Sequence, residues 1–294
     1  MTPEVALPQV SEGEAAHRSK ADYKSKLEPI WCPGCGDFGV LASLYESFAR
    51  KNLDPKDLVI VSGIGCSSRL PGFVNSYGLH SVHGRTMPIS LGVKTANPNL
   101  NVVVVGGDGD GYSIGAGHLP HAARRNPDIV YIVMDNEIYG LTKGQASPTS
   151  PNKLQTASTP MGNLDDPLNP LAMMISYGTA FVAQGYSGRP KELTDLIGAA
   201  MDHKGMSFIN VLSPCTTFYN TYKLIPPKLA VIDPTHDPSS APQAMALALD
   251  QSKVWLGVLF KQTRPTYDQR VAANIEAAKS RGVPKIEELF ARFH

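Results

Sequence analysis

VVVVGGDGDG, at residues 102–111, is the most informative stretch of this 294-residue chain. Four consecutive valines predict a strand that is buried on both faces, as in a parallel sheet. The glycines after the strand let the backbone approach a phosphate group closely, and the helix expected from about Ser113 to Arg125 attracts the anion to its N-terminus. A carboxylate repels a phosphate unless a divalent cation lies between them, so Asp108 indicates Mg²⁺.

The same unit of a strand followed by a helix recurs along the chain. Asp37 is the expected N-cap of a helix whose apolar stripe runs to Phe48, and another helix is expected over residues 190–204. Short apolar runs predict further strands at residues 58–61, 129–134, 179–183, 208–212 and 254–260. This alternation predicts an α/β fold, with a mostly parallel sheet and helices on both of its faces. Ligands of such sheets bind at the carboxyl ends of the strands.

Composition excludes several classes of protein. Lys and Arg total 27 against 26 for Asp and Glu, and this balance argues against nucleic-acid binding by phosphate neutralisation. No apolar run approaches about 18 residues, so we expect no membrane span. The first residues, MTPEVALPQVSEGEAAHRSK, mix proline, glutamate and lysine and lack the apolar core of a secretion signal. We therefore expect a cytoplasmic protein.

A second motif supports a cation at this edge of the sheet. Asp135-Asn136-Glu137-Ile138 follows the next predicted strand along the chain. Adjacent parallel strands place Asp108 and Asn136 side by side at their carboxyl ends. The alternative, a glycine-rich turn that binds nothing, leaves the matching Asn unexplained. The two motifs together favour a site for Mg²⁺ and a diphosphate.

The four cysteines form the second chemical feature of the sequence. Cys32 and Cys35 make a C-x-x-C pair, whereas Cys66 and Cys215 each follow a predicted strand. Four cysteines are too few for a disulfide scaffold, and the pair indicates a redox dithiol, a structural zinc site or a 4Fe–4S cluster. Because both single cysteines follow strands, all four can meet at the edge of the sheet that carries Asp108. The remaining alternative is that the two single cysteines are small buried side chains.

The spacing from the Gly-Asp-Gly turn to Asn136 resembles the signature of thiamine diphosphate enzymes. The resemblance implies that Mg²⁺ is held by the side chains of Asp108 and Asn136 and by the backbone carbonyl of Ile138. In one departure from that signature, Asp135-Asn136 stands where the family usually has two asparagines, although the ligand position is retained. The resemblance also implies that four residues lie near the phosphates: Gly109, Asp110, Gly140 and Leu141.

A longer series of motifs resembles one family of these enzymes. Six stretches occur in order between residues 29 and 225: WCPGCGDFG, SGIGCSSR, HGRTMPISLGVK, GGDGDGYSIGAGH, DNEIYGLTKGQASPTSP and LSPC. Together they resemble the β subunit of 2-oxoacid:ferredoxin oxidoreductases. The resemblance implies that Cys32, Cys35, Cys66 and Cys215 hold one 4Fe–4S cluster. It further implies that two loops contact the thiamine cofactor: Ile64, Gly65, Cys66 and Ser67 in the first, and His83, Gly84, Arg85 and Thr86 in the second.

The family resemblance also implies the reaction. A 2-oxoacid is oxidatively decarboxylated with coenzyme A to an acyl-CoA and CO₂, and the electrons pass to ferredoxin. The cofactor site around the aminopyrimidine is supplied by a separate α subunit, so we expect a heterodimer and no activity from this chain alone. His83 is a candidate for proton transfer beside the cofactor, whereas His118 and His121 are expected to be structural residues of a helix.

The substrate expected from the resemblance is 2-oxoglutarate. The Tyr-Gly-Leu-Thr-Lys-Gly-Gln stretch at residues 139–145 resembles the 2-oxoglutarate and broad 2-oxoacid branches more than the pyruvate branch. Arg69 and Lys143 lie close in sequence to expected ligands and are candidates to pair with the distal carboxylate of this substrate. The alternatives are a pyruvate-specific or broad-specificity subunit, a non-oxidative thiamine enzyme, and a zinc-stabilised assembly subunit without catalysis.

Three segments are expected along the chain. Residues 1–27 lack apolar periodicity and are expected to form an arm that is mobile or wraps a partner. Residues 28–225 are expected to bind thiamine diphosphate and the 4Fe–4S cluster, and residues 226–294 to form an extension that packs on this domain or on the partner subunit. Within the domain, residues 140–170 form a long Pro-, Ser- and Thr-rich stretch, and such stretches in compact domains are usually functional.

Overall fold

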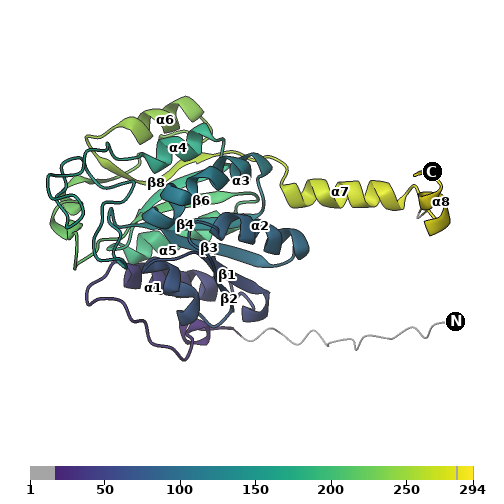
Figure 1. Cartoon of the computed structure of the whole chain (residues 1–294), viewed down its shortest axis with the longest axis horizontal. Coiled ribbons are helices and arrows are strands. Elements are labelled where there is room, and N and C mark those ends of the chain that lie inside the picture. The colour runs from purple at the N-terminus through teal and green to yellow at the C-terminus, as the bar shows by residue number, and fades with distance from the viewer. Residues whose placement is uncertain (1–16, 283, 294) are drawn as a thin grey trace.

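A single sheet of eight strands organises the computed structural model, which describes residues 17–282 and 284–293 (Figure 1). The strands lie in the order β2-β1-β3-β4-β6-β5-β8-β7. All neighbours from β2 to β5 are parallel, β8 is antiparallel to β5, and β7 is parallel to β8. This result confirms the mostly parallel sheet expected from the sequence. The strands are β1 (Leu58–Ser62), β2 (Tyr77–His80), β3 (Asn101–Gly107), β4 (Ile129–Asp135), β5 (Phe181–Tyr186), β6 (Ser207–Leu212), β7 (Leu229–Val231) and β8 (Val254–Lys261).

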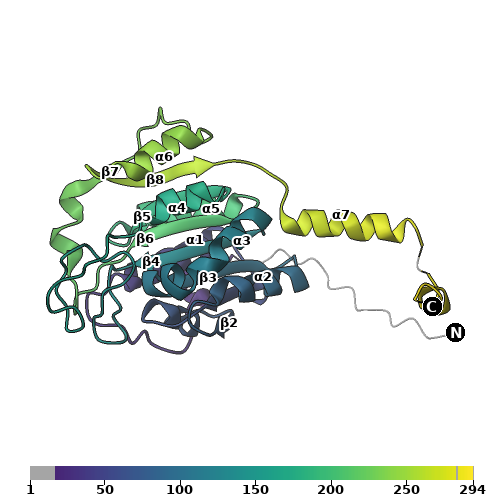
Figure 2. The ribbon, with the colours of Figure 1, turned by 45° about the horizontal axis from the view of Figure 1, so that its top comes forward.

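Helices cover both faces of the sheet, as expected. The described α-helices are α1 (Asp37–Arg50), α2 (Thr86–Ala96), α3 (Leu119–Arg125), α4 (Pro170–Ser176), α5 (Pro190–Asp202), α6 (Ala241–Leu249), α7 (Tyr267–Lys279) and α8 (Ile286–Phe290). Side chains of α1 and α5 share one hydrophobic core, and those of α2, α3, α4 and α6 share the other (Figure 2). None of the described helices is both long enough and apolar enough to cross a membrane.

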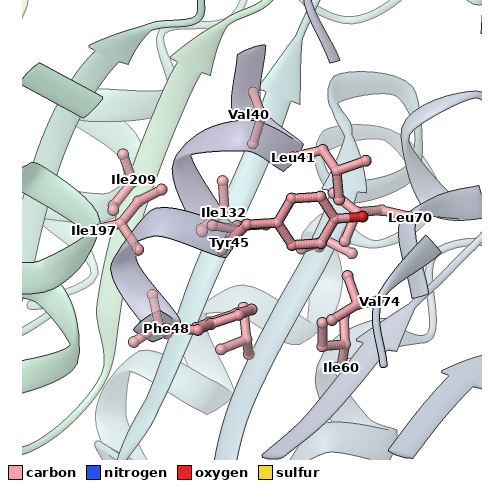
Figure 3. Close-up of a cluster of buried hydrophobic side chains, with 14 of the residues drawn as sticks. Val40, Leu41, Tyr45, Phe48, Ile60, Leu70, Val74, Ile132, Ile197 and Ile209 are labelled. Atoms are coloured by element: carbon pink, nitrogen blue, oxygen red, sulfur yellow. The ribbon is translucent and has the colours of Figure 1, made fainter. Parts of the chain in front are cut away.

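The strands are apolar throughout because both of their faces are buried. In β1, Leu58 and Ile60 face the core under α1 and α5, whereas Val59 and Val61 face the opposite core. On the first side, Leu41 and Phe48 of α1 pack among these strand residues (Figure 3). Because both faces of the sheet are packed, the strands cannot shift along their own axes. The points at which the strands end and the functional loops begin are therefore fixed.

The start of α1 differs from the sequence-based prediction. Asp37 is the first residue of the helix, and Gly36 stands at the N-cap position with α-helical dihedral angles. The prediction of Asp37 as the N-cap was wrong because this side chain is buried and accepts a hydrogen bond from the Ser213 hydroxyl at 2.6 Å. A tertiary contact therefore replaces the local capping bond that such a residue commonly makes.

The segment after β3 also differs from the single helix expected from Ser113 to Arg125. Asp108 already has α-helical dihedral angles, and a wide π-helical turn follows directly over Gly109–Ile114. A short 3₁₀ turn at Ala116–His118 leads into α3. Helical backbone therefore begins at the Gly-Asp-Gly motif itself, and the start of a helical turn is a favourable place for an anion.

Other elements were shifted or absent in the prediction. The strand expected at residues 179–183 is β5, which runs over Phe181–Tyr186. β2 was not predicted, because every residue of this edge strand is exposed and it lacks an apolar run. Likewise α2 was not predicted, since Pro88 and Gly92 within it are poor helix formers. The strand near residues 254–260 is confirmed as β8.

The two ends of the described chain behave differently. Residues 1–16 of the expected arm lie outside the described residues, but residues 17–27 contact the domain. Tyr23 is fully buried, and its hydroxyl oxygen lies 3.0 and 2.7 Å from the backbone oxygens of Phe48 and Leu53, to one of which it donates. At the other end, α7 projects from the body and buries none of its residues (Figure 2). Part of the segment before residue 28 therefore packs on the domain. The sequence did not reveal this contact because an isolated buried aromatic residue gives no periodic signal.

Candidate functional site

A cavity of about 450 Å³ opens at the carboxyl ends of β1, β3 and β4. Its position is the one expected for a ligand of a parallel sheet. It is lined by twelve of the residues named from the sequence: Ile64, Gly65, Cys66, Ser67, His83, Asp108, Gly109, Asp110, Asn136, Ile138, Gly140 and Leu141. The fold therefore brings residues from four separate stretches of the chain to one place.

Several other predicted residues do not line this cavity. Gly84 lies behind the wall, where its backbone N–H donates to Oδ1 of Asp110 at 2.8 Å. Arg85 donates to the backbone oxygen of Ile114 at 3.2 Å, and Thr86 is buried at the start of α2. Arg69 is half-buried and Lys143 is exposed, and both lie outside the wall.

Asp108 belongs to a buried polar network that the sequence did not predict. The Thr149 hydroxyl lies 2.8 Å from Oδ2 of Asp108 and 2.8 Å from Oδ1 of Asp135. A hydroxyl carries one hydrogen, so it can donate to only one of these two carboxylates at a time. Asn210 donates to the other oxygen of Asp135 at 3.2 Å, and Tyr112 donates to Asn210 at 2.7 Å. The polar contacts thus extend from Tyr112 to Asp108, with Thr149 donating to one of the two carboxylates at a time.

Burial and mutual repulsion disfavour the ionised forms of the carboxyl groups in and beside this network. Burial, and next the neighbouring Asp135, raise the pKa of Asp108. Burial also raises the pKa of Asp135, and burial followed by the charges of Asp135 and Asp108 raises the pKa of Glu137 to about 8. A cation beside Asp108 would offset this repulsion, and oxygen donors are the ligands that Mg²⁺ prefers. The site is therefore chemically suited to Mg²⁺.

A tight turn presents the other two expected Mg²⁺ ligands. The side-chain oxygen of Asn136 accepts a hydrogen bond from the backbone N–H of Ile138 at 3.1 Å. Between them, Glu137 has a φ of 59°, in the left-handed region that non-glycine residues rarely adopt. Such backbone persists only where its surroundings hold it, and it is common at functional sites. The Ser150 hydroxyl holds this turn by donating to the backbone oxygen of Glu137.

Asp110 lies in the turn over Gly109–Ile114 and connects it to two other loops beside the cavity, those of Ile64 and Gly84. Its Oδ1 accepts hydrogen bonds from the backbone N–H groups of Ile64 at 2.9 Å and Gly84 at 2.8 Å. The Nδ1 atom of His83 lies 3.0 Å from the same oxygen. A Cβ atom on Gly63 would lie 2.2 Å from both carboxylate oxygens, so only glycine fits there. Asp110 was predicted near the phosphates, and its side chain sets the position of these loops.

The four cysteines approach one another beside this cavity. A Cβ atom on Gly140 would lie 3.4 Å from Sγ of Cys66 and 3.9 Å from Sγ of Cys215. The indole N–H of Trp31, next to Cys32, donates to the backbone oxygen of Cys66 at 2.7 Å. In the part of the chain that the structure describes, no three His, Cys, Asp or Glu side chains are placed to hold a metal ion.

The pKa values of the half-buried Cys35 and Cys66 depend on neighbouring cysteines. Burial is the main cause that raises the pKa of Cys35, and Asp37, Cys215 and Cys66 add to it. Burial, followed by Asp37, Cys215 and Cys32, raises the pKa of Cys66 to about 11. Each thiolate of a 4Fe–4S cluster binds a different iron, so such ligands surround the cluster instead of meeting at one ion. The four cysteines come from three loops beside the cavity, an arrangement that is compatible with this requirement.

Sequence reasoning missed residues that complete the cavity wall. Tyr139, Thr142 and Gln145 line it, and the Tyr139 hydroxyl donates to the backbone oxygen of Gly109 at 3.2 Å. The stretch at residues 139–145 was used only as a sign of the family branch, and the Pro-, Ser- and Thr-rich stretch at residues 140–170 was interpreted as functional without singling out Thr149. The wall residues Tyr139 and Gln145 pair through their backbones, and this bridge holds the stretch against the site.

Comparisons with known proteins agree with this geometry. Residues 63–211 match the family described as the thiamine pyrophosphate enzyme C-terminal TPP binding domain, thiamine pyrophosphate being another name for thiamine diphosphate. Residues 215–275 match the family described as the C-terminal part of the pyruvate ferredoxin oxidoreductase β subunit. The chain is also 42% identical over 272 residues to 2-oxoacid:ferredoxin oxidoreductase 1, subunit beta, of Aeropyrum pernix, covering 87% of this chain and 86% of that protein. The chain belongs to the 2-oxoacid:ferredoxin oxidoreductase β subunits.

Two further relatives of this β subunit have names that include 2-oxoglutarate. The 2-oxoglutarate oxidoreductase subunit KorB of Mycobacterium tuberculosis is 43% identical over 197 residues, which is 67% of this chain and 53% of that protein. A solved structure of 2-oxoglutarate:ferredoxin oxidoreductase from Magnetococcus marinus, with 2-oxoglutarate, coenzyme A and succinyl-CoA bound, is 42% identical. It superposes with a TM-score of 0.91 and covers 95% of this chain and 97% of its own.

Proposed function

We propose that this β subunit binds thiamine diphosphate through Mg²⁺ and holds one 4Fe–4S cluster on its four cysteines. With an α subunit it would oxidise 2-oxoglutarate with coenzyme A to succinyl-CoA and CO₂ and pass the electrons to ferredoxin. The observation that carries the proposal is the position of Cys66, which lines the same cavity as Asp108 and Asn136. A cluster ligand in the wall of the cofactor cavity gives electrons a short path from the reaction to the cluster.

The oxygen atoms of this chain suit the proposed cation. The Asp108 and Asn136 side chains and the Ile138 carbonyl would hold Mg²⁺, and all three residues line the cavity. Thr149 then donates its single hydrogen to Asp135, because the cation neutralises Asp108. When bound, thiamine diphosphate supplies the electron sink for the loss of CO₂.

His83 is the residue proposed to move a proton in this cavity. Its Nδ1 atom lies 3.0 Å from Oδ1 of Asp110, which also holds the backbone N–H groups of Ile64 and Gly84. This ring nitrogen is buried and makes no hydrogen bond among the described residues, so the nearby carboxylate is the group that would favour a proton on it. The opposite nitrogen, Nε2, is then the atom that exchanges a proton with the reacting molecule.

An α subunit is proposed to close the cavity. Ile64 and Leu141 line it, yet each remains 38% exposed to solvent. Exposed apolar side chains at the edge of a binding site favour contact with another protein surface. The names of the relatives as β subunits support the same partner.

Two cations are proposed to recognise the distal carboxylate of 2-oxoglutarate. Arg69 lies one turn after Cys66, and its charge lowers the pKa of that thiol against the larger effect of burial. Lys143 follows the wall residues Gly140 and Leu141, and its backbone N–H donates to Gly140 at 3.2 Å. Both side chains belong to loops of the cavity wall without lining the cavity of this chain alone, so they would act at its rim. The 2-oxoglutarate names of two relatives support this substrate class.

One experiment tests the proposal as a whole. The chain is purified anaerobically, alone and together with its α subunit, and iron, acid-labile sulfide and thiamine diphosphate are measured. We expect about four iron and four sulfide per chain in both preparations, and oxidation of 2-oxoglutarate with coenzyme A only when both subunits are present.

Three results would contradict the proposal. Stoichiometric zinc without sulfide would remove the cluster, and activity of the isolated chain would remove the need for an α subunit. Equal turnover of pyruvate and 2-oxoglutarate by the complete enzyme would replace the proposed substrate with the broad 2-oxoacid class. Co-purification of the native complex gives metal, cofactor and partner from one sample.

A further inference from the structure

A buried carboxylate lies beside loops that carry the cysteines and has no part in the reaction proposed above. Asp37 is 1% exposed, and its Oδ1 accepts a hydrogen bond from the Ser213 hydroxyl at 2.6 Å. Its Oδ2 is also buried and has no hydrogen-bond partner among the described residues. An unpartnered buried charge is costly to keep, so its presence needs an explanation.

The position of Asp37 connects three loops that carry cysteines. Asp37 follows Cys35 by two residues, and its partner Ser213 precedes Cys215 by two residues. Burial raises the pKa of Asp37 to about 6, and the side chains of Ser213 and of Ser67, the residue after Cys66, act in the opposite direction. The carboxylate therefore stands where the loops bearing these cysteines converge.

Backbone packing holds this arrangement in place. A Cβ atom on Gly36 would lie 2.6 Å from the Ser213 hydroxyl and 2.7 Å from the Ser187 hydroxyl. The backbone N–H of Gly36 donates to the carbonyl oxygen of Pro214 at 3.0 Å. The loop from Cys35 to Asp37 thus rests directly on the loop that ends in Cys215, and Asp37 has little freedom to turn away.

The charge of Asp37 affects the pKa of two of the cysteines. Burial is the main cause that raises the pKa of the Cys35 and Cys66 thiols, and Asp37 adds to it in both cases. The cation of Arg69 lowers the pKa of Cys66. Arg69 is only half-buried, so solvent screens its charge more than that of the buried Asp37. Charges in a low-dielectric interior act strongly on one another.

We propose that Asp37 sets the reduction potential of the cluster, with its buried negative charge holding that potential low. The inference rests on the proposed function, since it needs the 4Fe–4S cluster on Cys32, Cys35, Cys66 and Cys215. The potential of an iron–sulfur cluster depends on net charge, hydrogen bonds and solvent exposure around it. A negative charge beside the cluster disfavours the added electron, and a cluster of low potential reduces an acceptor such as ferredoxin more readily.

The test is a potentiometric titration of the complete enzyme, with the reduced cluster followed by electron paramagnetic resonance. Asp37→Asn keeps the shape of the side chain and removes its charge. We expect its cluster to be at least tenfold easier to reduce at a fixed potential, an upward shift of about 59 mV or more for one electron. Asp37→Glu, which keeps the charge, is expected to stay close to the native potential.

Asp195→Asn is the matched control. Asp195 is an exposed carboxylate paired with Arg50 at the far end of α1, and a helix of this length separates Arg50 from Asp37 by about 20 Å. Because intervening solvent and protein screen a charge at this distance, the control is expected to leave the cluster potential unchanged.

Every outcome of this test decides the inference. An unchanged potential in Asp37→Asn, with native iron and sulfide content, overturns it and leaves the proposed function standing. Absence of iron and sulfide from the native enzyme overturns both. If Asp37→Asn loses the cluster, Asp37→Ser serves as a second uncharged variant. Loss of the cluster in both, with retention in Asp37→Glu, would give Asp37 a structural role only and overturn the inference.

Discussion

The hydroxyl of Thr149 lies 2.8 Å from Oδ2 of Asp108, although 41 positions separate the two residues in the chain. This contact attaches the long Pro-, Ser- and Thr-rich stretch to the end of β3. The same hydroxyl lies 2.8 Å from Asp135, so a single hydrogen is shared between two buried carboxylates. Removal of the hydroxyl leaves both of them without this donor.

Replacement of Thr149 should therefore weaken cofactor binding. In Thr149→Val the shape of the side chain is nearly kept, but the donor to Asp108 or Asp135 is lost. Residues that orient a metal ligand typically change metal affinity by about 10- to 100-fold when they are replaced. We expect a loss in this range for Mg²⁺-dependent binding of thiamine diphosphate, measured by titration calorimetry. Thr149→Ser keeps the hydroxyl and should bind nearly as the native chain does; equal affinity in the Val variant would refute the role.

Replacement of the proposed ligands should have a larger effect. Asp108→Ala removes the carboxylate proposed to hold Mg²⁺, so we expect no measurable Mg²⁺-dependent binding of thiamine diphosphate. Asn136→Ala removes one of the ligands and should weaken binding strongly without abolishing it. Asp166→Ala, at an exposed position, is the control and should bind normally. Native affinity in Asp108→Ala would exclude the proposed cation site.

The parts of the site that follow strands were predictable from the sequence. Asp108 and Asn136 each follow an apolar, β-branched run by no more than three positions, and such runs identify a buried strand and its end without knowledge of the rest of the fold. Parallel neighbours then bring those ends together. The position of Cys66 after β1 was predictable for the same reason.

The contacts of Thr149, Asp37 and Tyr23 could not be predicted in this way. Thr149 reaches Asp108 only through the course of a stretch that lacks periodicity, so its sequence neighbours carry no information about the contact. Asp37 matches a local capping rule, but the distant Ser213 engages its side chain. Tyr23 is an isolated aromatic residue that packs on α1. In each case a tertiary contact outweighs the local pattern.

The two cations at the rim of the cavity lead to a prediction on substrate choice. If Arg69 or Lys143 pairs with the distal carboxylate of 2-oxoglutarate, its replacement by Ala should raise the KM for that substrate. The loss of one charged hydrogen bond costs roughly 1.5 to 3 kcal/mol, or about 10- to 150-fold. The KM values for pyruvate and 2-oxobutyrate should change much less, because these substrates lack the distal carboxylate.

The control for this prediction is another lysine. Lys51→Ala removes a cation that pairs with Asp202 at the other end of α1, and it should change none of these KM values. Steady-state kinetics of the complete enzyme with all three substrates provides the comparison. An equal rise of KM for 2-oxoglutarate and pyruvate would show that neither cation recognises the distal carboxylate.

His203 is a buried histidine that should make the stability of the fold depend on pH. Its ring lies 5.5 Å from that of Phe181, and its Nε2 is buried without a hydrogen-bond partner among the described residues. Burial, and next the charge of Lys261, lower its pKa in the folded chain, while Asp128 acts in the opposite direction. The folded state therefore resists protonation of this ring more than the unfolded state does.

Stability from this histidine should be present above the pKa of an unfolded histidine, about 6.5, and should decrease as the pH falls below it. The reason is that the unfolded chain takes up a proton which the folded chain accepts only at lower pH. His203→Gln cannot titrate, so its urea-unfolding midpoint should fall less between pH 7.5 and about pH 5.5 than that of the native chain. His121→Gln, at an exposed position on α3, should retain the native pH dependence. Parallel pH profiles for the native chain and His203→Gln would mean that the folded state accommodates the charged ring without cost.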